Sequence, residues 1–160
     1  MAEIIDSGAR KTFDTGAVRD IQDNKGRCDL LPLDIVADVA WYIDGWNSDL
    51  LRLISTYQDD GNPAVLLDVM VRFGTFVWGN FETMLLEVSK HFEKGCEKYG
   101  EDNWKKGIPT KSYINSAVRH LIKYMRGDND EPHDRAFVWN IMCCVWTCAH
   151  KPELNSYAKS

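Results

Sequence analysis

The sequence lacks the patterns that identify several common classes of protein. It has no run of about 18 apolar residues, as a transmembrane helix requires, and its N-terminal segment MAEIIDSGARK has no apolar signal core. A glycine-rich phosphate loop, a dinucleotide-binding fingerprint and the pattern of a Ser/His/Asp triad are also missing. We therefore expect no membrane association, a cytoplasmic location, and none of these three kinds of active site.

Cysteine is present, but not at the spacing of a metal site or a disulfide framework. The five cysteines are an odd number, none belongs to a CxxC pair, and three lie in the apolar run 136–149. This pattern favours reduced, buried thiols in a cytosolic protein.

Basic residues are too few for nonspecific binding to nucleic acid. The 24 acidic residues exceed the 19 lysines and arginines, which gives a net charge of −5. A phosphorylated small molecule stays compatible with this charge, because a metal ion can neutralise its phosphates. The 160 residues are enough for one domain with a core of its own.

Apolar residues recur at helical spacing along most of the chain, and no segment has a convincing strand pattern. Residues 1–30 have no sustained period and predict an ordered, basic, nonhelical arm, with a solvated tail as the alternative. The predicted helices cover residues 33–45, 48–58, 63–78, 81–99 and 131–149, and a further helix is predicted from a cap at Thr110 or Ser112 to about 126. The expected fold class is therefore all-α, a helical bundle in a single domain over residues 1–160.

Two pairs of carboxylates are the candidate metal ligands. Glu93 and Glu97 are four residues apart and project from one side of a helix, and Glu131 and Asp134, three apart, have the same geometry. A cation between the members of a pair would remove their repulsion, and Mg²⁺ prefers such oxygen ligands. The alternatives are pairing of Glu97 with a nearby lysine and, for the second pair, stabilisation of a helix N-terminus.

Other polar and aromatic residues are candidates for contacts with a nucleotide. Asn140 lies in an apolar run, so its amide needs a hydrogen bond, either to a ligand or between helices. Asn103 and Trp104 could read and stack on a base, although Trp104 could instead cover the edge of the core. The basic candidates for the phosphates are Lys98, Lys105, Lys106, Arg119 and Lys123.

A histidine-based metal site is a weaker alternative. His133-Asp134 has the form of the HD pair of metal phosphohydrolases, and His91 or His120 could serve as the upstream histidine. No aspartate follows Asp134 to supply the last ligand of that site.

Several blocks of sequence, taken together, resemble one known family. HFEKGCEKYGEDNWKKGIP (91–109), SAVRHLIKYMRG (116–127) and DEPHDRAFVWN (130–140) resemble the dATP/dGTP diphosphohydrolases of phages and their bacterial hosts. These belong to the MazG-like all-α nucleoside triphosphate pyrophosphohydrolases. FDTGAVRDIQDNKGRCDLLP (13–32) is similar to that family's N-terminal block. The resemblance leaves out residues 41–80, which we expect to be a helical insertion.

The resemblance implies hydrolysis of dATP or dGTP between the α and β phosphates, giving a monophosphate and pyrophosphate. It implies Mg²⁺, with Mn²⁺ as an alternative, held by Glu93, Glu97, Glu131 and Asp134, one carboxylate taking the proton of the attacking water. Glu131 and Asp134 match the family's E-x-x-D motif. Glu93 and Glu97 depart from its E-x-x-E spacing, so Glu87 and Glu82 are alternatives on the same helix.

The resemblance also gives the N-terminal arm a role over the nucleotide. Arg19, Lys25 and Arg27 of the arm, with Lys98 and Arg119, are expected at the phosphates. Asn103, Trp104 and Asn140 are expected at the base or sugar. A homo-oligomer, dimer or tetramer, is implied as well. The alternative function is a non-catalytic helical phage protein that binds a nucleotide or a host protein, which six tryptophans would suit.

Overall fold

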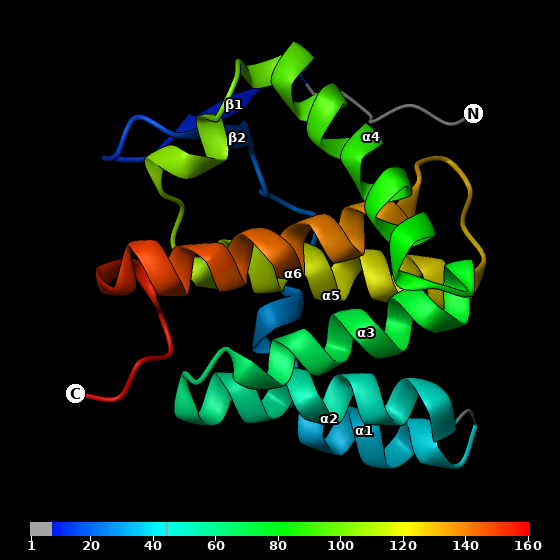
Figure 1. Ribbon diagram of the computed structural model, residues 1–160. Coiled ribbons are helices and arrows are strands. Elements are labelled where there is room, and N and C mark those ends of the chain that lie inside the picture. The colour runs from blue at the N-terminus through cyan, green and yellow to red at the C-terminus, as the bar shows by residue number, and fades with distance from the viewer. Residues whose placement is uncertain (1–7, 44) are drawn as a thin grey trace.

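The computed structural model describes residues 8–43 and 45–160, which form helices and one short β-hairpin (Figure 1). The α-helices are α1 (Leu33–Trp41), α2 (Gly45–Asp60), α3 (Ala64–Trp78), α4 (Phe81–Tyr99), α5 (Thr110–Arg126) and α6 (His133–His150). The strands are β1 (Arg10–Thr12) and β2 (Val18–Asp20), and the 3-10 turns are η1 (Cys28–Leu30), η2 (Asn103–Lys106) and η3 (Pro152–Leu154). The predicted all-α class is confirmed.

Helices α5 and α6 lie side by side through the middle of the molecule. Helices α1, α2 and α3 lie on one side of this pair, and α4 and the hairpin lie on the other (Figure 1). Helix α6 packs against α3, α4 and α5, so its nearly continuous apolar sequence is explained by burial from several directions. Phe137, Ile141 and Cys144 of this helix are fully buried.

Several predicted boundaries differ from the structure. Gly45 begins α2, whereas the sequence pattern placed it at the end of α1. Helix α6 begins at His133, so Glu131 lies in the preceding loop and not in the first helical turn. Asn155 fixes the segment after α6, because it accepts a hydrogen bond from the Tyr57 hydroxyl at 2.9 Å and donates one to Gly61.

The prediction that the chain contains no strand is wrong for the N-terminal arm. Strands β1 and β2 pair antiparallel, with Lys11 opposite Arg19. Each has only three residues, which is too short for an alternation pattern to be recognised.

Helix α4 leaves α3 through a sharp turn that sets its position over the α5–α6 pair. The two helices meet at 97°, and Gly74 of α3 lies so close to Met84 of α4 that a side chain there would collide with the Met84 sulfur. Among the described helices, none alone is long and apolar enough to cross a membrane; α3 and α4 pass that test only as this bent pair.

Candidate functional site

A cavity of 510 Å³ lies between α4, α5, α6 and the N-terminal arm. This volume is within the range of about 300–1,000 Å³ that is typical of small-molecule sites. Strand β2 and residues Gln22, Lys25 and Cys28 of the arm form one wall. The opposite walls come from the second half of α4, from η2, and from the facing sides of α5 and α6.

The cavity is basic although the protein as a whole is acidic. Six cationic side chains line it against three carboxylates, in a chain whose net charge is −5. The cations are Arg19, Lys25, Lys98, Arg119, Lys123 and Arg126, and the carboxylates are Asp20, Asp102 and Glu131. Concentration of positive charge in a concave site favours an anionic ligand.

Asn103 and Tyr99 hold the hairpin against the helices. The Asn103 amide accepts a hydrogen bond from the Val18 N–H and donates one to the Val18 carbonyl, both at 2.9 Å, as a neighbouring strand would. The Tyr99 hydroxyl bonds the backbone and the carboxylate of Asp20. Burial raises the pKa of Asp20, but hydrogen bonds from Lys98 and Tyr99 outweigh it, so the pKa lies below its usual value and the carboxylate is charged.

Arg119 fixes the next part of the arm. Its guanidinium, only 8% exposed, donates to the carbonyls of Gly26 (2.6 Å) and Lys25 (3.2 Å) and to the side chains of Gln22 (2.8 Å) and Asn115 (2.9 Å). The planar guanidinium has five N–H donors and here bonds four acceptors, one more than the three N–H donors of a lysine ammonium could each bond singly. Arg119 lines the cavity, and its donors are used to hold the arm.

Arg19 points from β2 toward α5 and α6. One of its nitrogens donates to the Asn140 amide oxygen at 3.0 Å and to Ser116 at 3.2 Å, and its guanidinium lies over the rings of Tyr113 and Trp139. The Asn140 amide in turn donates to the carbonyl of Ala136. A second guanidinium nitrogen, Nη1, is buried and has no hydrogen-bond partner.

Two further unpaired polar atoms lie beside Arg19 in the cavity wall. The indole nitrogen of Trp139 and Nδ1 of His91 are buried without a hydrogen-bond partner, and the two rings are 5.4 Å apart. Buried polar groups are normally paired, so a group of unpaired ones in a cavity indicates the place of a ligand or of ordered water. Burial, and then the positive charge of Arg19, lower the pKa of His91 to about 4, so this imidazole is neutral near pH 7.

We expect the buried His91 to make the fold sensitive to acid. Below pH 6.5 the unfolded chain binds a proton at this residue, whereas the folded chain does so only near pH 4, so the free energy of unfolding falls with decreasing pH in this window. The slope contributed by one such group is about 1.4 kcal/mol per pH unit. Urea denaturation between pH 4.5 and 7.5 should show a shallower dependence for His91→Phe. The exposed His150→Gln is the control; equal slopes for His91→Phe and wild type would contradict the prediction.

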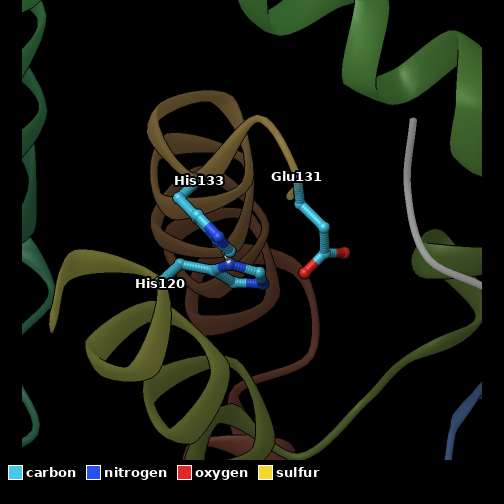
Figure 2. Close-up of side chains that lie close together, drawn as sticks. All are labelled: His120, Glu131 and His133. Atoms are coloured by element: carbon cyan, nitrogen blue, oxygen red, sulfur yellow. Dashed lines mark hydrogen bonds between the residues drawn. The ribbon is translucent and has the colours of Figure 1, made fainter. Parts of the chain in front are cut away.

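At the α5–α6 side of the cavity, His120, Glu131 and His133 form a compact group (Figure 2). One ligand atom from each lies within 4.8 Å of the others. His133 is 2% exposed and its Nε2 lies 2.7 Å from the Asp130 carboxylate, and its Nδ1 lies 2.9 Å from Nδ1 of His120. Burial, and then the proximity of His133, lower the pKa of His120 well below its ordinary value. Two imidazoles and a carboxylate form a donor set that fits a divalent metal ion.

The structure brings only one of the four predicted carboxylates to the cavity. Glu131 lines it, whereas Glu93, Glu97 and Asp134 do not. Glu93 and Glu97 are exposed, and Glu97 accepts a hydrogen bond from Lys94 at 3.2 Å. Asp134 accepts from the backbone N–H of Arg135 at 2.8 Å. In the described part of the chain, none of these three joins a group of potential metal ligands.

The alternative carboxylates on α4 also lie away from the cavity lining. Glu87 is ion-paired with Lys90 and Arg135, and hydrogen bonds from these two residues lower its pKa. Glu82 is exposed in the first turn of α4. The HD arrangement is not formed either, since His133 pairs with Asp130 and Asp134 points elsewhere.

The remaining predicted residues are divided between the cavity and the surface. Lys25, Lys98 and Trp104 line the cavity, and Lys98 is ion-paired with Asp20 at 2.7 Å. Trp104 packs edge-on against Phe92 and Trp146. Arg27 does not line the cavity; it forms a bidentate ion pair with Asp29. Lys105 and Lys106 are exposed outside the lining.

Sequence reasoning missed the roles of Asp130, Tyr99 and Gln22 and considered His120 only for the HD site. The signal that could have found the histidine pair is the spacing of His120 near the end of one helix and His133 at the start of the next. Helices joined by a short loop are antiparallel neighbours, so residues at these two ends meet.

Comparison with known protein families gives a match over the helices that line the cavity. A family model described as dATP/dGTP diphosphohydrolase, N-terminal, matches residues 67–157, which is more than half of the chain. The matched region includes α4, η2, α5 and α6 and therefore the histidine pair and Glu131, and it excludes the arm. It begins inside the predicted insertion 41–80. No curated protein and no solved structure gives a significant match.

Proposed function

Since the chain belongs to the dATP/dGTP diphosphohydrolase family, we propose that it hydrolyses dATP or dGTP between the α and β phosphates. The products are a deoxynucleoside monophosphate and pyrophosphate. The family name supports the diphosphohydrolase activity. The position of the cleaved bond and the dependence on a divalent ion are parts of the proposal.

The observation that carries the proposal is the basic cavity with unpaired donors in its wall. A triphosphate offers many acceptor oxygens and several negative charges. The Arg19 guanidinium has a buried nitrogen without a partner, and among the described residues neither Lys25 nor Lys123 has an ion-pair partner. These three cations are proposed to bind the phosphates, and Lys98, which is ion-paired with Asp20 at 2.7 Å, is proposed to add its charge from the α4 side of the cavity.

The base is proposed to lie toward the aromatic part of the cavity. Trp139, Trp104 and Tyr99 line this part, and aromatic rings stack on bases of any identity. The unpaired indole N–H of Trp139 can donate to an acceptor on the base or sugar. Asn103 and Asn140 are proposed to act on the nucleotide by holding the arm and Arg19, respectively, in position.

A divalent ion is proposed at the end of the cavity that Glu131 lines. Such an ion, when bound, neutralises phosphate charge and lowers the pKa of water. Of the residues predicted to hold it, Glu131 has the position for this role. The involvement of Glu93, Glu97 and Asp134 stays a prediction, which the variants in the Discussion test. The side chains around the site bind and orient the triphosphate and exclude bulk water.

The proposal is tested with a panel of nucleotides. The purified full chain is incubated with each dNTP and each NTP in Mg²⁺ and, separately, in Mn²⁺, and the products are separated by anion-exchange chromatography. We expect monophosphate and pyrophosphate from dATP or dGTP, and no reaction in EDTA. A diphosphate with orthophosphate would contradict cleavage between the α and β phosphates. If every nucleotide in the panel stays intact, the proposed enzymatic activity is contradicted and the non-catalytic alternative is favoured.

We also propose a homo-oligomer. Two helices carry apolar pairs one turn apart at more than half exposure, Ile35 and Val39 on α1 and Leu67 and Val71 on α3. Burial of such a stripe against a second copy would stabilise a dimer. Val71→Glu is therefore expected to lower the molar mass measured by size exclusion with light scattering. Thr56→Glu, at an exposed polar position of α2, is the control. A monomeric wild-type protein would contradict the proposal.

A further inference from the structure

Asp130, His133 and His120 form a continuous chain of hydrogen bonds that ends at the cavity. Nε2 of His133 lies 2.7 Å from the Asp130 carboxylate, and Nδ1 of His133 lies 2.9 Å from Nδ1 of His120. The ring centroids of the two histidines are 5.1 Å apart. This separation is close to that of two imidazoles whose nitrogens point directly at each other.

When both rings are neutral, one pair of tautomers satisfies the two contacts. A carboxylate only accepts hydrogen bonds, so Nε2 of His133 is protonated and donates its hydrogen bond to Asp130. A neutral imidazole has one N–H, so Nδ1 of His133 is an acceptor and Nδ1 of His120 must donate to it. The remaining nitrogen of His120, Nε2, therefore has a free lone pair.

This lone pair is directed toward Glu131. Figure 2 shows the His120 ring between His133 and Glu131, with its second nitrogen on the side of the carboxylate. His120 and Glu131 both line the cavity, and their ligand atoms lie within 4.8 Å of each other. A bare imidazole nitrogen and a carboxylate oxygen thus converge at the edge of the basic cavity.

We propose that Nε2 of His120 and the Glu131 carboxylate bind a divalent transition-metal ion, with His133 and Asp130 as positioning residues. An imidazole ligand suits Mn²⁺, Co²⁺, Fe²⁺ or Zn²⁺, whereas Mg²⁺ prefers oxygen throughout. A histidine ligand whose other nitrogen is held by a hydrogen bond is the usual arrangement in metal sites. The inference deepens the proposed function and rests on it for the ion's role, but the binding itself is measured without nucleotide.

The test is electron paramagnetic resonance of Mn²⁺ added to the metal-free full chain. Continuous-wave spectra give the affinity, because bound Mn²⁺ loses the sharp signal of the free ion. Pulsed spectra detect a directly bound nitrogen. We expect nitrogen modulation on the bound ion, and we expect its frequencies to change when the protein is prepared with ¹⁵N-labelled histidine. This labelling experiment needs no variant and so does not depend on how a substitution folds.

Variants assign the residues. His120→Gln should abolish the nitrogen modulation, because glutamine offers the ion only its amide oxygen. His133→Gln should keep the modulation and weaken Mn²⁺ binding by about 10- to 100-fold, as loss of an orienting partner does. His150→Gln, an exposed histidine on the same helix as His133, should change neither reading. Circular dichroism checks that each variant is folded.

Two results would overturn the inference. One is Mn²⁺ bound without nitrogen modulation in the labelled and unlabelled wild-type protein, which would mean an all-oxygen site. The other is no Mn²⁺ binding at any accessible concentration. If hydrolysis of dATP or dGTP with Mg²⁺ is nevertheless found, the proposed function stands and this inference alone fails. If Mn²⁺ binds with nitrogen modulation but the protein hydrolyses no nucleotide, this inference stands and the proposed function fails.

Discussion

Replacement of Glu131 by Gln is expected to lower kcat/KM for dATP or dGTP by at least ~100-fold, since loss of an orienting group around a metal already costs about 10- to 100-fold. Glu131 lies in the loop before α6, outside any helix, and it is only partly buried. The folded structure should therefore be retained. Steady-state kinetics with pyrophosphate detection measures the first effect, and thermal denaturation measures the second.

The matched controls for Glu131→Gln are Glu93→Gln, Glu97→Gln and Asp134→Asn. Each makes the same change at a carboxylate that the sequence pattern assigns to the metal but that does not line the cavity. From their positions we expect each to keep activity within a few-fold of wild type. Losses as large as that of Glu131→Gln would instead support the four-carboxylate site. Unchanged activity of Glu131→Gln itself would refute the role of Glu131 as a ligand of the catalytic metal ion.

The second large effect is expected for Arg119→Ala. This change removes the donors for two backbone carbonyls and two side chains in a region where Arg119 is almost fully buried. A hydrogen bond to a charged group contributes about 1.5–3 kcal/mol, and the contributions are not additive, so we expect a loss of roughly 3 kcal/mol. The arm should loosen first, since it receives most of these bonds.

Two measurements separate a loosened arm from a general loss of stability. Hydrogen exchange should accelerate at the backbone amide of Lys25, which donates to the Gln22 carbonyl in the segment that Arg119 holds, more than in α5 and α6 of the Arg119→Ala protein. The value of kcat/KM should fall by about 100-fold, because displaced groups no longer contact the triphosphate. Arg52→Ala, which breaks an exposed ion pair with Asp38, should cost less than about 1 kcal/mol. Unaltered exchange in the arm would show that Arg119 does not hold it.

The helices could be predicted closely because long apolar periodicity dominates their local sequence. The predicted ranges 63–78 and 81–99 agree with α3 and α4 to within one residue, and the predicted end at 126 agrees with that of α5. The hairpin could not be predicted in this way, because its attachment depends on Asn103 and Tyr99, which are about 80 positions away in the chain. Bonds of this kind leave no periodic signal in either segment.

The periodicity of apolar residues also could not predict which face of α4 lies toward the cavity. Phe81 and Leu85 have the same helical spacing as the apolar residues Val88 and Phe92, yet they are 57% and 40% exposed. Gly74 and the 97° turn set how α4 crosses its neighbours, and that rotation directs His91 and Lys98 inward and leaves Glu93 and Glu97 outside. A spacing of four residues shows that two carboxylates share a side, but not which side faces the site.

The way the arm is attached has a consequence for how the protein can evolve. Asn103 bonds only the backbone of Val18, and Arg119 bonds the backbone carbonyls of Lys25 and Gly26. The side chains at positions 18 and 25 line the cavity but do not make these attachments. New side chains at these two positions could therefore reshape the wall while the arm stays docked, so the preference for a ligand can change by single substitutions that leave the helical scaffold intact.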